Sequence, residues 1–203
     1  MNVYKAIFNN NAQFQVIFKN NFICQDQQLG HDSKNLNSKI NIHFVGLRDG
    51  TCIFNSEKFL ESLQVASSIC KDLARMGLPF LFVNVLNEYN EIIKMAASAS
   101  YQPVLIGDFI GGSFTNNLIN TPTVLFVSSS KKHSFFLKEA HKLNLPSFSI
   151  NDSDVSTNLS AFPITISDDC LEVQHNVLRV ISQRLIKGCL LNYADSISIK
   201  YLL

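Results

Sequence analysis

The sequence predicts a three-layer α/β fold, in which a parallel sheet carries helices on both faces. The first observation is two nearly continuous apolar runs, Pro79 to Val85 and Thr123 to Val127, because strands buried on both faces of a parallel sheet have this composition. The second is the alternation of strands and amphipathic helices along most of the chain. A chain of 203 residues with 46% hydrophobic content can bury one sizeable core. We therefore expect a single domain over residues 1–203, without a linker or repeat.

The first quarter of the chain predicts a hairpin preceded by irregular structure. Gly30 to Ser38 is polar and predicts a loop. Ile40 to Val45 predicts a strand and Cys52 to Phe54 its return, because Arg48-Asp49-Gly50 between them contains the Asp-Gly pair of a tight turn. In the N-terminal extension of residues 1–29, the candidate elements are a strand from Phe14 to Phe18 and a short helix from Phe22 to Leu29.

Four later segments have apolar residues three or four positions apart, which predicts helices with one buried face. The first, Glu57 to Met76, ends before Gly77, a residue type that commonly terminates helices. The last begins at Asp168-Asp169, acids expected to cap its positive N-terminus, and has Leu171 and Leu178 on its buried side. It leaves residues 191–203 as a C-terminal tail. The other predicted helices are 87–100 and 131–143, and the other predicted strands are 104–106, 148–150 and 163–166.

Composition excludes several classes of function. The net charge of +1 provides no general basic field, so any contact with nucleic acid has to come from a local patch. The five cysteines lie far apart without a Cys-x-x-Cys pair, which favours reduced thiols over disulfides or a zinc site. The histidines are equally scattered, so we expect no metal and no cofactor. No apolar run approaches the roughly 18 residues that cross a membrane, and residues 1–22 lack the layout of a signal or import sequence.

No set of residues predicts an enzyme. Asp168-Asp169 could form a catalytic pair, but adjacent side chains point apart and helix capping is the simpler interpretation. Ser113 lacks the Gly-x-Ser-x-Gly elbow of a nucleophile. His31 could be a general base or a loop histidine that packs or contacts phosphate. Lys131-Lys132-His133 could bind RNA or form a solvated first helical turn.

A glycine pair, Gly111-Gly112, lies between an apolar strand and the short polar residues Ser113, Thr115 and Asn116. Adjacent glycines permit a tight turn or the close approach of another molecule. The Gly-x-x-x-x-Gly-Lys-[Ser/Thr] spacing of a phosphate-binding loop is absent. An ordinary turn and a contact point therefore remain as the two interpretations.

Six segments together resemble the ribosomal protein S2 family of the small ribosomal subunit. Gly30 to Lys39 resembles the family's loop Gly-His-x-x-x-x-x-Asn-Pro-Lys-Met, and Gly46 to Gly50 resembles its hairpin Phe-Gly-x-Arg-Asn-Gly. Ile110 to Asn116 is similar to the family's Leu-Gly-Gly-Thr-Leu-Thr-Asn. Order and near-constant spacing from Gly30 to Ile186 carry the resemblance. The other similar segments are Lys138-Glu139-Ala140 with Leu143 and Pro146, Asp152-Ser153-Asp154, and Asp168-Asp169.

The resemblance implies a flavodoxin-like sheet and a structural constituent of the small ribosomal subunit. Its implied partners are small-subunit rRNA and neighbouring ribosomal proteins, with no enzymatic activity, no membrane and no small-molecule substrate. A flavodoxin-like enzyme that binds a small molecule at the strand ends is the alternative. The implied RNA-binding residues are His31, Lys34, Asn37, Lys39, Arg48, Gly111, Gly112, Thr115, Asn116, Lys131 and Lys132.

The departures from the family pattern suggest a divergent member. Ser38 stands where the family has Pro, and Asp108 stands where it has Arg. Only five residues separate Asn116 from Pro122, where bacterial members carry a helical hairpin, so we expect that insertion to be absent. A short, low-charge member resembles mitochondrial versions. This implies the small subunit of a mitochondrial ribosome and a gene within the organelle, with a plastid or the bacterial cytoplasm as alternatives.

Overall fold

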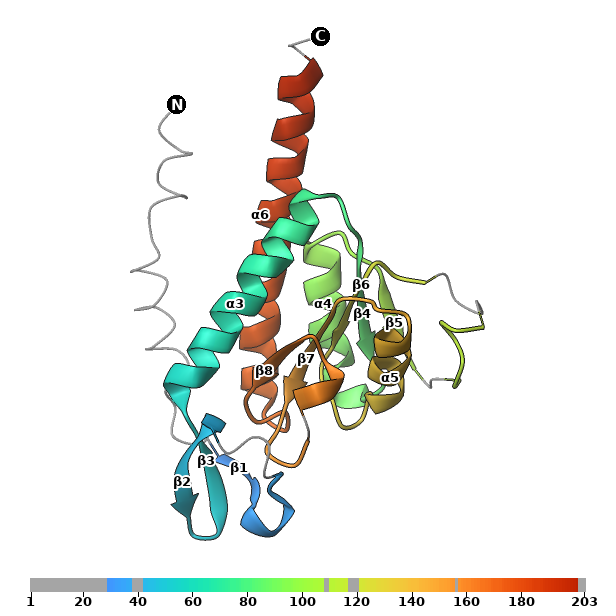
Figure 1. Cartoon of the computed structure of the whole chain (residues 1–203). Coiled ribbons are helices and arrows are strands. Elements are labelled where there is room, and N and C mark those ends of the chain that lie inside the picture. Colours follow the sequence, from blue (N-terminus) through green and yellow to red (C-terminus); the bar gives the residue numbers. More distant parts are fainter. Residues whose placement is uncertain (1–28, 38–41, 108–109, 117–120, 156, 201–203) are drawn as a thin grey trace.

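The centre of the molecule is a five-stranded parallel sheet (Figure 1). The computed structural model describes residues 29–37, 42–107, 110–116, 121–155 and 157–200. The strand order is β5-β4-β6-β7-β8, the flavodoxin-like order in which the second strand of the sheet lies outside the first. The strands are β4 (Phe80–Asn84), β5 (Val104–Ile106), β6 (Val124–Val127), β7 (Ser147–Asn151) and β8 (Phe162–Thr165).

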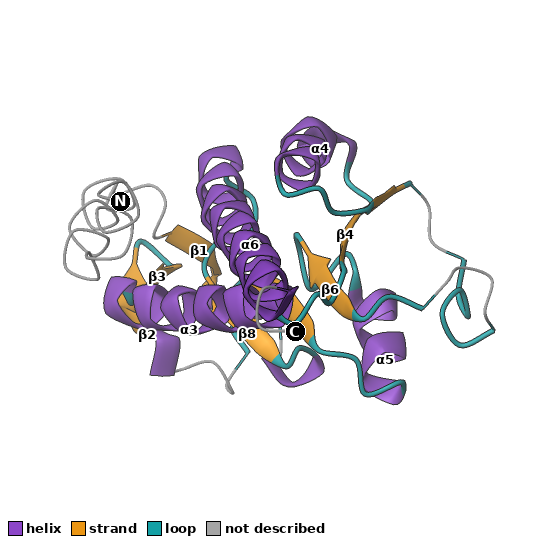
Figure 2. Cartoon of the chain, turned by 90° about the horizontal axis from the view of Figure 1, so that it is seen from above, coloured by secondary structure: helices purple, strands orange, loops and turns teal. Residues whose placement is uncertain are grey.

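Helices cover both faces of this sheet, which confirms the predicted three-layer fold (Figure 2). On β4, Phe80 and Phe82 point toward one face, and Leu81 and Val83 toward the other. The first face packs against α3 (Ser56–Arg75), α4 (Asn90–Ala99) and α6 (Leu171–Lys200), and the second against α5 (Ser134–Lys142). Burial on both faces explains why β4 and β6 are nearly continuous apolar runs. None of the helices in the described residues is long and apolar enough to cross a membrane.

A second, antiparallel sheet has the order β1-β3-β2. The predicted hairpin is confirmed, because Asp49 and Gly50 both have positive φ, 49° and 82°, as a two-residue type I′ turn requires. Its first strand lies later than expected, at residues 44–48. The expected loop 30–38 is wrong in its first part, because residues 29–32 pair with β3. The elements are β1 (Leu29–Asp32), the 3₁₀ turn η2 (Ser33–Asn35), β2 (Phe44–Arg48) and β3 (Thr51–Phe54).

Three predicted helix boundaries also need correction. Helix α4 begins only after the 3₁₀ turn η4 (Asn87–Tyr89), and α5 begins at Ser134 because His133 is buried in a preceding turn. Helix α6 begins at Leu171, which is 52% exposed and not on the buried side as expected. The 3₁₀ turn η5 (Thr157–Leu159) precedes β8. The candidate strand 14–18 and all but the last residue of the candidate helix 22–29 lie outside the described residues.

Helix α6 continues to residue 200, well beyond the predicted end near residue 190. Its continuation is joined to the end of α3, since Arg75 Nε lies 2.8 Å from Asp195 Oδ2 and Asn192 Nδ2 donates to the Arg75 carbonyl at 2.6 Å. The segment expected as a tail, residues 191–203, is therefore helical as far as Lys200. Figure 1 shows this part of α6 rising past the end of α3.

Gly188 sits where α6 crosses α3 at very short range. A Cβ atom at this position would lie 2.4 Å from the Lys71 carbonyl oxygen and 2.6 Å from Ala74 Cβ. We expect Gly188→Ala to lower the free energy of unfolding by about 1–2 kcal/mol, because overpacking costs more than the gain in helix propensity. Urea unfolding measures this change. The exposed Gln183→Ala is the control, with an expected change within about 0.5 kcal/mol. A Gly188→Ala variant as stable as the wild type would contradict the packing argument.

Candidate functional site

The predicted Gly30 loop and hairpin lie side by side on the carboxyl-terminal edge of the main sheet. The Ser33 amide donates to the Gly50 carbonyl at 2.8 Å, which joins η2 to the hairpin turn. Two bonds join β1 and its continuation to Ser153, which follows β7: the His31 amide donates to Ser153 Oγ at 2.9 Å, and the Asn37 amide donates to the Ser153 carbonyl at 3.0 Å. Three segments that are distant in the sequence therefore form one surface.

Two of the predicted basic residues, Lys34 and Arg48, are exposed on this surface. Lys34 belongs to η2, and Arg48 is the last residue of β2, directly before the turn that η2 contacts. Arg48 Nε lies 3.9 Å from Asp49 Oδ2, a long contact between two highly exposed side chains. An exposed ion pair of this kind is weak, so the Arg48 guanidinium can exchange Asp49 for another anion. The third predicted basic residue, Lys39, lies outside the described residues.

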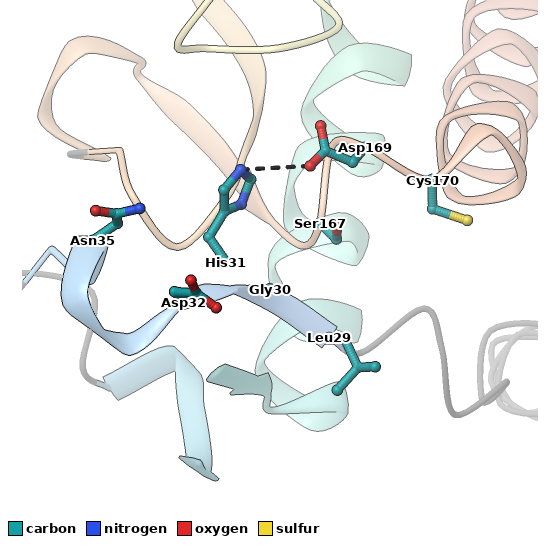
Figure 3. A pocket seen from close by; sticks show the side chains of 8 residues that line it. All are labelled: Leu29, Gly30, His31, Asp32, Asn35, Ser167, Asp169 and Cys170. Atoms are coloured by element: carbon teal, nitrogen blue, oxygen red, sulfur yellow. Dashed lines mark ion pairs between the residues drawn. The ribbon is translucent and has the colours of Figure 1, made fainter. Parts of the chain in front are cut away.

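His31 connects β1 to two carboxylates at the ends of β7 and β8. Its Nδ1 lies 3.2 Å from Asp152 Oδ1. Its Nε2 lies 3.5 Å from Asp169 Oδ2, the pair marked by a dashed line in Figure 3. Burial alone lowers the pKa of His31, but the charge and hydrogen bond of Asp152, with Asp154 and Asp169, outweigh it and raise the pKa above its ordinary value. The histidine thus fastens the small sheet to the main one, and its side chain is only 29% exposed.

The same three residues could hold a divalent cation. One nitrogen of His31 and one carboxylate oxygen each from Asp152 and Asp169 lie within 4.8 Å of one another. His31 and Asp169 also line a polar pocket of about 490 Å³ together with Gly30, Asp32 and Ser167. Imidazole with carboxylates suits zinc and similar ions, provided that the histidine is neutral. The sequence analysis expected no metal because no ligands lie at a typical spacing along the chain. Such spacing does not reveal these three donors, because they come from three separate segments.

The Gly111-Gly112 turn is held from inside by a single carboxylate. The amide of Gly112 donates to Glu139 Oε1 at 2.5 Å, and those of Phe114 and Thr115 donate to Oε2 at 2.9 and 3.4 Å. Glu139 belongs to α5 and is only 8% exposed. Phe114 packs beside Phe136 of the same helix, with ring centroids 5.6 Å apart. The fold therefore joins two of the segments that resemble the S2 family.

These bonds prevent the turn from acting as a phosphate cradle. Consecutive backbone amides in a turn can form an anion-binding nest, but here the anion is the protein's own. A phosphate at the same amides would meet Glu139 at contact distance, where two unit charges repel by about 4 kcal/mol at an effective dielectric of about 20. Any contact that the turn makes with RNA has to use its other groups.

The two glycines of the pair have different roles. Gly112 has φ of 90°, and a Cβ atom there would lie 2.5 Å from Asn116 Nδ2, whereas a Cβ at Gly111 would meet nothing within 4 Å. We expect Gly112→Ala to lower the free energy of unfolding by about 1–2 kcal/mol, the cost of a left-handed alanine. Gly111→Ala is the matched control and should be nearly neutral. Denaturant titration of both variants checks the difference, and equal losses would contradict it.

The predicted pair Lys131-Lys132 is divided by the fold. The ammonium of Lys131 forms an ion pair with the largely buried Asp154, while Lys132 is exposed. Both residues lie in a turn and not in a first helical turn, since α5 begins at Ser134. Lys131 therefore has its charge partly neutralised within the protein, and Lys132 is the more available of the two.

Asp168 was expected to cap the last helix, but its contacts are with the ends of the strands. Helix α6 begins three residues later, and the Asp168 side chain is hydrogen-bonded to Ser129, while its amide donates to Asp152 Oδ2 at 3.1 Å. Burial raises the pKa of Asp168 to about 6, despite the Ser129 bond that lowers it. Asp168 is thus part of the buried polar layer at the strand ends.

The crevice where flavodoxin-like folds usually bind ligands is filled by the protein's own side chains. It lies beyond β4 and β6, where the strand order reverses. Ser128 Oγ donates to Asn84 Oδ1 at 2.9 Å, Gln174 Nε2 donates to the Ser128 carbonyl at 2.8 Å, and the Val85 amide donates to His133 Nε2 at 2.8 Å. All four side chains are completely buried. This network argues against the alternative of a small-molecule enzyme.

Comparison with known proteins identifies the family of this chain. The sequence model of the family described as ribosomal protein S2 matches residues 23–120 and 116–188. The chain belongs to the ribosomal protein S2 family. Residues 116–120 fall in both matched segments, and this is where the helical hairpin is expected to be absent.

Three bacterial S2 relatives illustrate how far the chain has diverged. Each is named small ribosomal subunit protein uS2. The Bifidobacterium animalis subsp. lactis protein is 23% identical over 71% of this chain and 64% of its own length. The Coprothermobacter proteolyticus protein is 21% identical over 78% of each chain. The Fusobacterium nucleatum protein is 21% identical over 78% of this chain and 85% of its own length.

Proposed function

We propose that this S2-family chain is a structural constituent of the small ribosomal subunit. Ribosomal protein S2 is a structural and not an enzymatic family, and the match over residues 23–188 is the observation that carries the proposal. The crevice beyond β4 and β6 agrees with it, because buried side chains there are hydrogen-bonded to one another and to the backbone of the strand ends. The chain acts in translation by holding other components in place, and it supplies no chemistry of its own.

The partners of the chain are small-subunit rRNA and neighbouring ribosomal proteins. The surface proposed for RNA consists of η2 and the hairpin turn, which are hydrogen-bonded to each other. Lys34 of η2 and Arg48 at the start of the turn are both exposed on it. Asn37 follows η2 closely, and Lys39, two positions later in the sequence, lies outside the described residues. Lys132 adds a charge at a separate place. His31 is assigned to fastening β1, since both of its ring nitrogens face carboxylates.

Membership in the S2 family places the chain on a ribosome, and the compartment of that ribosome is part of the proposal. The S2 relatives described above are bacterial, and the chain is ribosome-associated like them. We assign it to the small subunit of a mitochondrial ribosome. The support is the short connection between Asn116 and Pro122, the net charge of +1, and a composition rich in Asn, Phe, Ile and Lys.

Density-gradient sedimentation of ribosomes from purified mitochondria tests the proposal. After dissociation of the subunits at low magnesium, the chain should be found with small-subunit rRNA, at one copy for each rRNA molecule. Quantitative mass spectrometry of the gradient fractions gives this ratio. A chain that remains at the top of the gradient with a bound nucleotide would support the enzyme alternative and overturn the proposal.

A further inference from the structure

The turn 110–116 has hydrogen-bonded polar groups on its inside, whereas its outside is exposed and uncharged. Its amides at Gly112, Phe114 and Thr115 donate to Glu139, as described above. Further bonds within the turn run from Ser113 Oγ to the Ile110 carbonyl at 2.6 Å and from the Asn116 amide to the Gly112 carbonyl at 2.7 Å. Most of the polar groups that face inward are therefore paired.

The outward groups are those of a neutral contact surface. Ile110 is 71% exposed, and Gly111, Thr115 and Asn116 are also exposed. The sequence Ile-Gly-Gly-Ser-Phe-Thr-Asn contains no charged residue. Thr115 provides a hydroxyl and Asn116 an amide, groups that both donate and accept hydrogen bonds. Gly111 adds a stretch of backbone with open space around it.

We propose that Glu139 is a positioning residue for this turn, and that the turn contacts rRNA through ribose hydroxyls and base edges and not through phosphates. The inference rests on the proposed function and specifies how one of its contacts is made. Ribose 2′-hydroxyls and base edges are matched by the hydroxyl of Thr115 and the amide of Asn116. Phosphates are disfavoured because Glu139 occupies the amides that would bind them.

Glu139 sets the shape of this surface from a distance. Its two oxygens accept three amide hydrogens from residues on both sides of Ser113, which fixes the curvature of the chain. Hydrogen bonds to a carboxylate are stronger than those to a neutral acceptor. A glutamine at this position has only one acceptor oxygen, and its NH₂ group would face an amide hydrogen. The Glu139→Gln variant therefore keeps the size of the side chain while loosening the turn.

The first test uses the free, full-length protein and follows amide hydrogen exchange by NMR. Glu139→Gln should speed exchange at Gly112 and Phe114 by at least about tenfold, which is the size expected when a hydrogen bond to a charged group is lost. The exposed Glu91→Gln on α4, which removes one carboxylate elsewhere, should leave those amides unchanged. Unchanged exchange in Glu139→Gln would overturn the positioning role, whether or not the chain binds ribosomes.

The second test measures how retention on isolated small subunits depends on salt. Thr115→Val keeps the shape of the side chain and removes its hydroxyl, and it should weaken binding by about 2–10-fold at every salt concentration. Lys34→Ala should instead reduce the salt slope by about one. Unchanged binding of Thr115→Val would mean that the hydroxyl makes no contact, and this result would overturn the inference. Failure of the wild-type chain to bind would overturn the proposed function itself.

Discussion

Replacement of Lys34, Lys39 and Arg48 together by alanine is expected to release the chain from small subunits at moderate salt. A chain with a net charge of +1 can make few phosphate contacts, so each contact carries a large share of the salt-dependent affinity. Every neutralised phosphate contributes about 0.7–0.9 to the slope of log affinity against log salt. Loss of three contacts should reduce this slope by about 2–3. A salt-wash series on isolated subunits, with retained protein quantified, measures it.

The matched control removes three lysines from other surfaces. Lys94, Lys138 and Lys142 are exposed on α4 and α5, and their replacement by alanine changes the net charge by the same amount. Lys187 is a poorer choice, because partial burial and the nearby charges of Arg184 and Lys71 lower its pKa. Similar release by the two triple variants would show that general charge, and not the surface formed by η2 and the hairpin, holds the RNA.

His133 is expected to make the folded protein sensitive to acid. Burial lowers the pKa of His133 to about 4, below its ordinary value of 6.5. The Val85 amide donates to Nε2, so the ring proton is on Nδ1, which faces the Ser129 carbonyl at 2.6 Å. Between pH 6.5 and 4 the unfolded chain binds the extra proton. The stability contributed by neutral His133 is therefore present above pH 6.5 and is lost as the pH falls toward 4.

Asp168 has the opposite dependence over nearly the same range. Its folded pKa of about 6 lies above the ordinary value of 3.8, so the folded protein binds the extra proton between these values, and acidification stabilises it. From pH 7.5 to 4.5, His133 should remove about 2.5 kcal/mol and Asp168 should restore about 2 kcal/mol. We therefore expect these two groups together to change the free energy of unfolding of the wild type only slightly between pH 7.5 and 4.5.

Two substitutions separate the opposing contributions. His133→Gln keeps one acceptor for the Val85 amide and one donor for the Ser129 carbonyl, and it should make the protein more stable at pH 4.5 relative to pH 7.5, by about 2 kcal/mol. Asp168→Asn should instead expose the full loss of about 2.5 kcal/mol due to His133. Urea unfolding at the two pH values measures both, with the exposed His175→Gln as control. Parallel pH profiles for the two variants would contradict this account.

The parallel sheet was predictable because its strands are buried on both faces. Pro79 to Val85 and Thr123 to Val127 have no polar face, as is typical of strands in a parallel sheet that helices cover on both sides. The hairpin was predictable from Asp49-Gly50, whose positive φ angles few other pairs adopt easily. In both cases, residues close together in the sequence determine the structure.

The missed features depend on contacts between distant residues. Strand β1 was assigned to a loop because its partner, β3, lies about 20 positions later and nothing in Gly30-His31-Asp32 is apolar. The Glu139 bonds to the glycine turn span 24 to 27 positions, and His31 meets Ser153 across 122. A carboxylate or imidazole in an isolated segment does not reveal which backbone or side chain it will meet. The resemblance to the S2 family placed these segments in order, and the structure pairs them.

Ultraviolet cross-linking of intact small subunits, followed by mass spectrometry of nucleotide-bearing peptides, tests most directly where this S2-family chain meets rRNA. The account predicts cross-links within residues 29–54, where η2 and the hairpin lie together, and within residues 110–116. It predicts none on the outer faces of α3 and α4. Cross-links confined to those two helices, with the hairpin and the glycine turn unmodified, would contradict it.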